Sequence, residues 1–127
     1  MKEYAQAMSD FFNGHPEPIN SLYSNSDEIS LAQLSGSFIL GRKQVIETVR
    51  HNATKYRESE NVAFRTLAKY VTNEFAYIVQ IEQTNVKIDG KNEAAPLALR
   101  VTSIFRRENS RWKLLHRHVD SFIVQSK

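Results

Sequence analysis

The sequence predicts an α+β domain in which helices pack on one face of a strongly curved antiparallel sheet. Up to about residue 56, apolar side chains recur mostly at three- and four-residue spacing, which is the period of a helix. From about residue 61 the chain changes to four long segments rich in β-branched and aromatic residues, which favour strands. Helices followed by a run of strands are typical of this class. At 127 residues, the chain is predicted to form a single domain spanning 1–127.

Three helices are predicted in the first part of the chain. The apolar stripe of the first consists of Tyr4, Ala5, Met8, Phe11 and Phe12. Gly14 is placed to end it, and Pro18 suits the first position of a short second helix. A third helix follows Gly41, with a stripe made of Val45, Ile46, Val49, Ala53 and Tyr56.

One short strand is predicted between the second and third helices, and four long ones after them. ISLAQL, residues 29–34, alternates apolar and polar positions, and SGSF reads as a loop with a close approach at Gly36. The long strands are VAFRTLAKYV, EFAYIVQIEQTNVKI, LALRVTSIFRR and RWKLLHRHVDSFIV. Asn73–Glu74, Asp89–Gly90 and Asn109–Ser110 mark turns between them, so we expect an antiparallel meander.

Composition places the chain among ordinary globular proteins, with 41% hydrophobic and 24% charged residues. It has no cysteine, which fits a reducing compartment. Its net charge of +3 comes from 17 basic and 14 acidic residues spread along the chain, whereas nucleic-acid binders concentrate basic residues in one stripe. No apolar run reaches the roughly 20 residues of a membrane span, and the N-terminus lacks a signal-peptide pattern. We expect a cytoplasmic protein without nucleic-acid or membrane partners.

The segment WKLLHRHVD, residues 112–120, is the strongest candidate for a functional site. On a regular strand, Trp112, Leu114, His116, His118 and Asp120 share one face. A face that begins apolar and ends in two imidazoles and a carboxylate is typical of a pocket wall. We therefore predict that His116 or His118 transfers protons, with Asp120 orienting the imidazole and raising its pKa.

Two other interpretations of the histidine pair stay open. Alternate strand positions lie about 6.5–7 Å apart, so both imidazoles can bind one metal with Asp120 as a third ligand. The motif is short, however, and the other histidines show no partner spacing, so we expect no metal and no cofactor. Alternatively, either imidazole is a core side chain that is hydrogen-bonded to a neighbour.

The register of the last hairpin decides which residues lie beside the histidines. A three-residue turn at 108–110 pairs Arg107 with Arg111, and then Thr102 lies opposite His116 and Arg100 opposite His118. A four-residue turn shifts the register and places Val101 opposite His118. We favour the first, because an inward Arg100 finds an acceptor in Asp120. The alternative places Arg100 on the outer face or in a dimer interface.

Three aromatic residues are candidates for the pocket lining: Phe38, Tyr77 and Trp112. For each of them, however, packing is the commoner role of such a side chain. In the predicted hairpin, Arg106 lies across from Trp112 and is placed to stack on its ring.

The order of elements, together with FFNGHPEPINSLYS, SDEISL, GRKQV and above all LALRVTSIFRRENSRWKLLHRHVD, resembles the SnoaL-like, ketosteroid-isomerase-like branch of the nuclear transport factor 2-like superfamily. The resemblance covers nearly the whole chain. It implies a cone-shaped roll of the cystatin-like type, a curved mixed sheet around the N-terminal helices, with a pocket at the open end. It also implies a homodimer formed through the sheet.

The resemblance leaves the activity open, because this fold carries many functions. Ketosteroid isomerases use an Asp base in the loop after the first strand, with a Tyr and a protonated Asp as oxyanion hole. The matching loop here, QLSGSFILG, has no carboxylate, so that reaction lacks its base. SnoaL-type cyclases place an acid/base carboxylate in the last strand, which fits Asp120 loosely.

Our leading hypothesis is a pocket for a small apolar or amphipathic molecule. In the enzymatic version of this hypothesis, the protein catalyses cofactor-independent isomerisation, cyclisation or dehydration of that molecule. Ligand-binding residues would be Arg100, Thr102, Phe38, Tyr77 and Trp112. The rival hypothesis is a non-catalytic dimeric binding or association module.

Overall fold

The computed structural model describes residues 2–121 and confirms the predicted α+β class. Its three helices are α1 (Lys2–Phe12), α2 (Glu17–Leu22) and α3 (Arg42–Ala53). The strands are β1 (Ser30–Ala32), β2 (Phe38–Leu40), β3 (Tyr56–Val71), β4 (Phe75–Ile88), β5 (Ala95–Glu108) and β6 (Arg111–Ser121). No helix in this described part is both long and apolar enough to cross a membrane.

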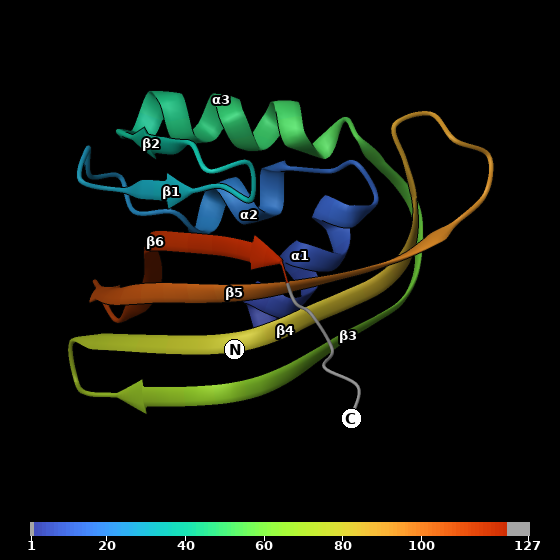
Figure 1. The fold of residues 1–127 in the computed structure, drawn as a ribbon. Helices are drawn as coiled ribbons and strands as arrows, with labels where there is room; N and C mark the ends of the chain where they lie inside the picture. The colour runs from blue at the N-terminus through green and yellow to red at the C-terminus, as the bar shows by residue number, and fades with distance from the viewer. Residues whose placement is uncertain (1, 122–127) are drawn as a thin grey trace.

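All six strands join one mixed sheet in the order β2-β1-β6-β5-β4-β3 (Figure 1). As predicted, β3 to β6 form an antiparallel meander. The short hairpin β1–β2 extends the sheet beyond β6, and β1 runs parallel to β6. The sheet is therefore open and curved, with β2 and β3 at its edges.

Three local predictions need correction. Strand β2 lies in a segment predicted to be a loop, and Tyr56 begins β3 instead of extending the third helix. Gly36 has a φ of +96° in the turn between β1 and β2, a conformation that glycine adopts readily. Apart from its chain neighbours, no residue has an atom within 4 Å of the place that a Cβ would occupy, so the predicted close approach is wrong. The part of the last predicted strand beyond Ser121 lies outside the described residues.

The curvature of the sheet comes from irregularities in β3. Its pairing with β4 shifts register at three places, between Arg57 and Glu60, between Glu60 and Ala63 and between Thr66 and Ala68. Glu58 and Asn61 adopt positive φ angles of 52° and 58° there. Such bulges increase the local bend and twist of a strand. The long strands consequently curl toward the end of α3 (Figure 1).

Helix α1 packs against the concave side of the sheet, which we call the inner face. Tyr4 meets the Phe105 ring edge-on at 5.9 Å, and Phe11 and Phe12 each lie 5.6 Å from the Tyr56 ring. The helix ends at Phe12, and Gly14 follows it with a φ of +87°, which few other residues adopt readily.

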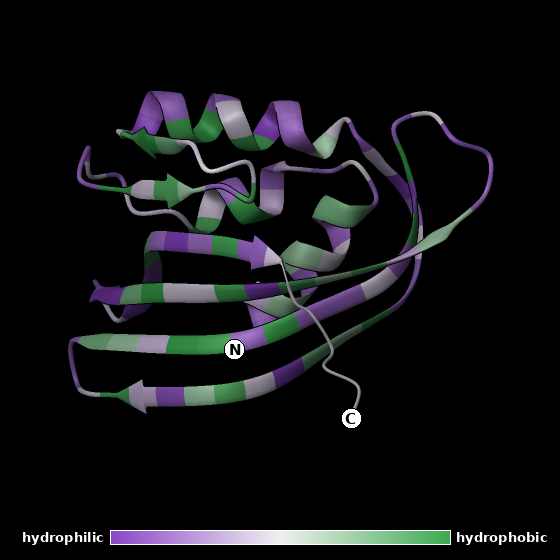
Figure 2. Cartoon of the chain, in the orientation of Figure 1, coloured by the Kyte–Doolittle hydropathy of each residue, from purple (hydrophilic) through white to green (hydrophobic). Residues whose placement is uncertain are grey.

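The opposite side of the sheet is the outer face. Hydrophobic and hydrophilic residues alternate along much of the long strands, as expected for a sheet with two different faces (Figure 2). On β5, Val101, Ser103 and Phe105 are buried on the inner face, so the residues between them point outward.

Candidate functional site

The face predicted to form the pocket wall is the outer face. Thr102 pairs with His118 instead of the predicted His116, and Arg100 pairs with Asp120 instead of His118, so these four side chains gather together in a different register from the predicted one. However, Arg100 and His118 are exposed, whereas Arg117, between the two histidines, is buried at 5% exposure. The prediction that the imidazole-and-acid side chains turn toward the interior is therefore wrong in its direction.

Two local features explain this reversal. The turn has two residues, Asn109 and Ser110, both at positive φ, so Arg107 pairs with Trp112 instead of Arg111. Next, Phe105 pairs with Leu114 but Ile104 pairs with His116, which leaves Leu115 as the extra residue of a bulge.

A bulge of one residue exchanges the two faces of a strand from that point onward. Leu114 is fully buried before it and Arg117 is buried after it. The alternation that links Trp112 to Asp120 is therefore broken in the middle of the segment.

His116 is half-buried on the outer face and contacts β1. Its Nδ1 lies 2.7 Å from the Ser30 hydroxyl, and its ring centroid lies 6.3 Å from that of Phe38. Burial and the neighbouring His118 lower the pKa of His116, so the neutral imidazole is favoured. The predicted partnership with Asp120, which would raise this pKa, does not form.

Asp120 instead binds Arg100. The guanidinium donates from Nε and Nη2 to the two carboxylate oxygens, each over 3.0 Å. These hydrogen bonds hold the pKa of Asp120 below its usual value. Both side chains are more than 40% exposed, so this is a surface ion pair. Within residues 2–121, no three His, Asp, Glu or Cys side chains are grouped to hold a metal ion.

The predicted aromatic residues are also dispersed. Phe38 is 61% exposed and Tyr77 43% exposed, and Tyr77 stacks on Tyr70 at 6.4 Å. Trp112 has Arg107 over its ring at 4.8 Å, not Arg106, which pairs with Glu108.

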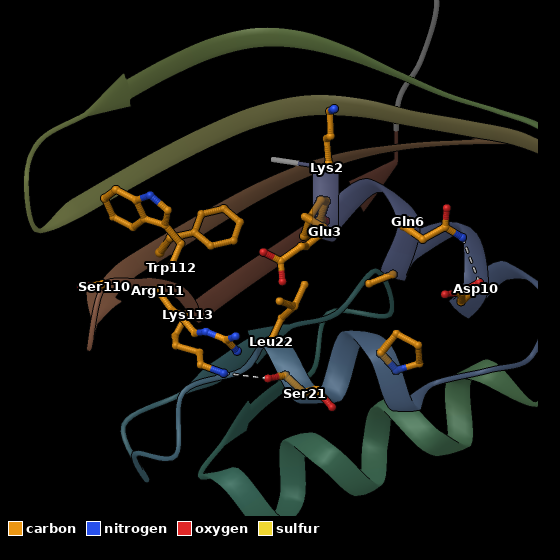
Figure 3. Close-up of a pocket in the computed structure, with 14 residues that line it drawn as sticks. Lys2, Glu3, Gln6, Asp10, Ser21, Leu22, Ser110, Arg111, Trp112 and Lys113 are labelled. Carbon is orange, nitrogen blue, oxygen red and sulfur yellow. Dashed lines mark hydrogen bonds between the residues drawn. The ribbon is translucent and has the colours of Figure 1, made fainter.

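Trp112 lines an open groove between α1, α2 and the β5–β6 hairpin, with a volume of about 670 Å³. Figure 3 shows Trp112 and Glu3 approaching this groove from β6 and α1, while Lys113 donates to the Ser21 carbonyl. The predicted ligand-binding residues thus do not converge on one pocket.

A different cavity opens on the inner face, and we call it the inner cavity. Its volume is about 330 Å³, and α1, the β1–β2 loop, α3 and the strands β5 and β6 surround it. Its lining is mostly apolar and consists of Met8, Phe11, Phe12, Leu31, Gln33, Leu34, Ser35, Val49, Asn52, Lys55, Tyr56, Leu99, Arg117 and Val119.

The buried wall of the inner cavity holds a polar cluster around Arg117. Tyr4 on α1 donates a 2.5 Å hydrogen bond to Glu82 on β4, and it accepts one of 3.2 Å from Arg117 Nε. Glu82 is completely buried, and one of its oxygens lies 3.7 Å from Arg117 Nη2. Ser103 and Gln80 add longer hydrogen bonds to Tyr4 and Glu82.

The electrostatics of this cluster follow from its burial. Burial raises the pKa of the Tyr4 hydroxyl far above its usual value, so Tyr4 remains a proton donor. Burial alone would lower the pKa of Arg117, but the neighbouring Tyr4, Tyr23 and Glu82 outweigh it and the pKa rises. Arg117 therefore stays charged, and Glu82 offsets its charge inside the protein.

Sequence reasoning misses all three members of this cluster. Arg117 stands between two histidines that carry the prediction, and Tyr4 is assigned only to an apolar stripe. One signal is available for Glu82, which is the single acid within FAYIVQIEQTNVKI and the single charged residue of this strand before Lys87. A charged residue in such a strand is expected to have a buried partner.

Comparison with known families agrees with this architecture. The model of the SnoaL-like domain matches residues 3–125. The chain belongs to the SnoaL-like domain family. A comparison with curated proteins found no sequence match.

Solved structures share the fold of this SnoaL-like chain at low sequence identity. A ketosteroid isomerase-like protein from Erwinia carotovora atroseptica is 11% identical, with a TM-score of 0.75 over 96% of this chain and 94% of that one. A nuclear transport factor 2-like protein of unknown function from Shewanella oneidensis is 16% identical, with a TM-score of 0.70 over 94% and 92%. A protein with a ketosteroid isomerase-like fold from Catenulispora acidiphila, in complex with trimethylamine, is 15% identical, with a TM-score of 0.57 over 93% and 81%.

Proposed function

We propose that this SnoaL-like protein binds a small, mostly apolar organic molecule in the inner cavity, with one ligand oxygen accepting a hydrogen bond from Arg117. The observation that carries the proposal is a buried guanidinium in the wall of an otherwise apolar cavity. Small-molecule sites have this character, with apolar walls and a few polar groups that fix the ligand.

The size of the cavity supports the same class of ligand. Its volume of about 330 Å³ lies at the lower end of the range for small-molecule sites, roughly 300–1,000 Å³. The ligand is therefore compact, with a ring or a short chain filling the space between Phe11, Val49 and Leu99.

Acid/base isomerisation, cyclisation or dehydration is a narrower form of this proposal. Within residues 2–121, the lining of the inner cavity supplies the guanidinium of Arg117, the ammonium of Lys55 and the phenol of Tyr56, but neither a carboxylate nor an imidazole. His116, His118 and Asp120 are not among those lining residues, so the proton transfer predicted for them lacks contact with the cavity. Binding is the form of the proposal that the geometry supports best.

The test uses 2-naphthol, an apolar ring system with one hydroxyl oxygen. A ligand that binds only the native state raises the melting temperature with concentration, by about 2.7 kcal/mol of added stability at 100 times Kd. Val119→Phe should block the cavity and abolish this shift. Val71→Phe adds the same ring at an exposed position outside the cavity and should preserve the shift.

Two results contradict the proposal. One is a melting temperature that does not depend on 2-naphthol concentration in the wild-type protein. The other is an equal shift in the Val119→Phe and wild-type proteins, which would place the ligand elsewhere.

We also propose a homodimer that forms through the outer face. Five large hydrophobic side chains are exposed on it: Phe38, Leu40, Tyr70, Phe75 and Tyr77. They lie in two groups at opposite edges of the sheet, Phe38 and Leu40 on β2 and the three others on β3 and β4, and exposed apolar side chains of this kind mark interaction sites. A dimer also accords with the family resemblance of the sequence.

Sedimentation velocity tests the dimer. Tyr77→Glu should produce a monomer, because it places a charge among these apolar side chains. Leu34→Glu changes an exposed side chain at the inner cavity instead and should leave the dimer intact. A wild-type protein that remains monomeric at high concentration would contradict the homodimer proposal. We further propose that the protein is cytoplasmic, which fits its lack of cysteine, and cell fractionation tests this location.

A further inference from the structure

We propose that the ligand of the inner cavity is an amphipathic organic anion, whose ionised group lies at the rim beside Lys55 while an uncharged oxygen contacts Arg117. This inference rests on the proposed small-molecule function and adds the charge and orientation of the ligand.

The first observation is the sign of the charges that line the cavity. Lys55 and Arg117 are the charged residues among its described lining, and both are basic. A cavity that carries charges of one sign within low-dielectric walls concentrates ligands of the opposite sign. Glu82 offsets the charge of Arg117 from within the wall, so the positive charge of Lys55 is the one that favours an anion over a neutral or cationic molecule of equal size.

The two basic residues occupy different depths. Arg117 is buried and belongs to the cluster with Tyr4 and Glu82, which marks the inner wall. Lys55 is exposed, and it also lines the groove next to β2 and α3, together with Glu47. Lys55 therefore marks the rim of the cavity.

The difference in their partners orients the ligand. Glu82 already offsets the charge of Arg117, so a ligand carboxylate there would lose its hydration without meeting an uncompensated cation. No ion pair is found for Lys55 within residues 2–121. At the rim an anion keeps part of its hydration, which lowers the cost of binding. The ionised group is thus favoured at Lys55 and a neutral oxygen at Arg117.

The backbone of Lys55 is held firmly enough to present its side chain at this rim. Its N–H donates to the Asn52 carbonyl over 3.1 Å, and its own carbonyl accepts from Asp89 N–H over 2.9 Å. The pKa of Tyr56 rises mainly through burial, and the Asp89 carboxylate raises it further. Asp89 itself is not among the residues that line the inner cavity.

The facing side of the rim is also fixed. Asn52 Nδ2 donates to Gln33 Oε1 over 2.8 Å, and Gln33 Nε2 donates to the Ser37 hydroxyl over 2.7 Å. These bonds join the end of α3 to the β1–β2 loop. The fold therefore sets the position of the Lys55 backbone relative to this loop.

The test compares 6-hydroxy-2-naphthoate with its methyl ester, which has the same ring and hydroxyl but no charge. Isothermal titration at pH 7.5 should show at least fivefold tighter binding of the acid. Lys55→Glu should remove this preference or reverse it. Lys43→Glu makes the same charge change on an α3 residue outside the lining and should leave the preference within twofold. High salt should weaken the binding of the acid more than the binding of the ester.

The outcomes separate this inference from the function on which it rests. Equal affinity for acid and ester, or a preference that Lys55→Glu does not change, overturns the anion proposal and leaves the cavity function standing. If 2-naphthol, the acid and the ester all fail to bind, or all still bind Val119→Phe, both proposals fall.

Discussion

Replacing Arg117 with methionine should destabilise the fold by about 3–5 kcal/mol. The substitution preserves most of the side-chain volume but leaves the Glu82 carboxylate buried without its cation, and removing one partner of a buried ion pair costs this much. Glu82 is completely buried and Arg117 is 5% exposed, so water does not reach the carboxylate to replace the lost charge.

The structure places the loss in the lower half of that range. Glu82 keeps its hydrogen bonds from Tyr4 and Gln80, which continue to stabilise the charged carboxylate. A loss of about 3 kcal/mol is still a large fraction of the 5–15 kcal/mol that holds a typical domain together. At about 4 °C for each kcal/mol, the melting temperature should fall by about 12 °C.

Urea unfolding followed by circular dichroism measures the change, and a second substitution tests its cause. Adding Glu82→Gln to Arg117→Met removes the stranded charge while keeping an amide of the same shape. The double variant should recover about 2 kcal/mol or more relative to Arg117→Met alone. Arg107→Met removes an exposed guanidinium from Trp112 and serves as the control, with a loss below about 1 kcal/mol.

Additive losses in the double variant would refute this reasoning, because they would show that Glu82 does not depend on Arg117. A loss below 1 kcal/mol for Arg117→Met alone would do so as well, since a solvated carboxylate would then be the simpler explanation.

Three further predictions follow from single contacts. Tyr4→Phe removes the donor to Glu82 and should cost about 1.5–3 kcal/mol in urea unfolding, and a change below 0.5 kcal/mol would contradict a charge-assisted bond. Because burial lowers the pKa of folded His116 below its ordinary 6.5, the unfolded chain binds the proton first. Stability should therefore fall as pH drops through about 6.5, and His116→Gln should reduce this slope; an unchanged slope counts against it. Ser110→Gly relieves a φ of 66° and should add about 0.5–1 kcal/mol in thermal unfolding, whereas a loss would show that the turn is not strained.

The accurate predictions concern features set by neighbours in the sequence. The apolar stripe of α1 is confirmed at Tyr4, Met8, Phe11 and Phe12, but Ala7 is buried in place of the predicted Ala5. The positive φ of Gly14 just after the helix and the turns at Asp89 and Asn109 are also confirmed, and each of these features depends on a few adjacent residues. The order of the meander follows in turn, because strands joined by short turns pair as neighbours.

The candidate site is predicted less well, because its geometry depends on one extra residue in β6. The polar residues of the outer face are grouped correctly, since Thr102 neighbours His118 and Arg100 binds Asp120. No residue type or pattern in WKLLHRHVD indicates that Leu115 forms a bulge. A shift of one residue exchanges inside for outside, so a correct grouping is assigned to the wrong face.

By itself, the sequence determined the three helices, the short strand β1 and the order of the long strands β3 to β6, because helical period, strand alternation and turn chemistry act over a few residues. Only the tertiary structure decided that Arg117 and not His116 or His118 faces the interior, and that Tyr4 and Glu82, 78 residues apart, meet beside it. Those contacts depend on strand register and on how α1 docks against a bent sheet. Both are set by packing between distant segments, which local patterns do not encode.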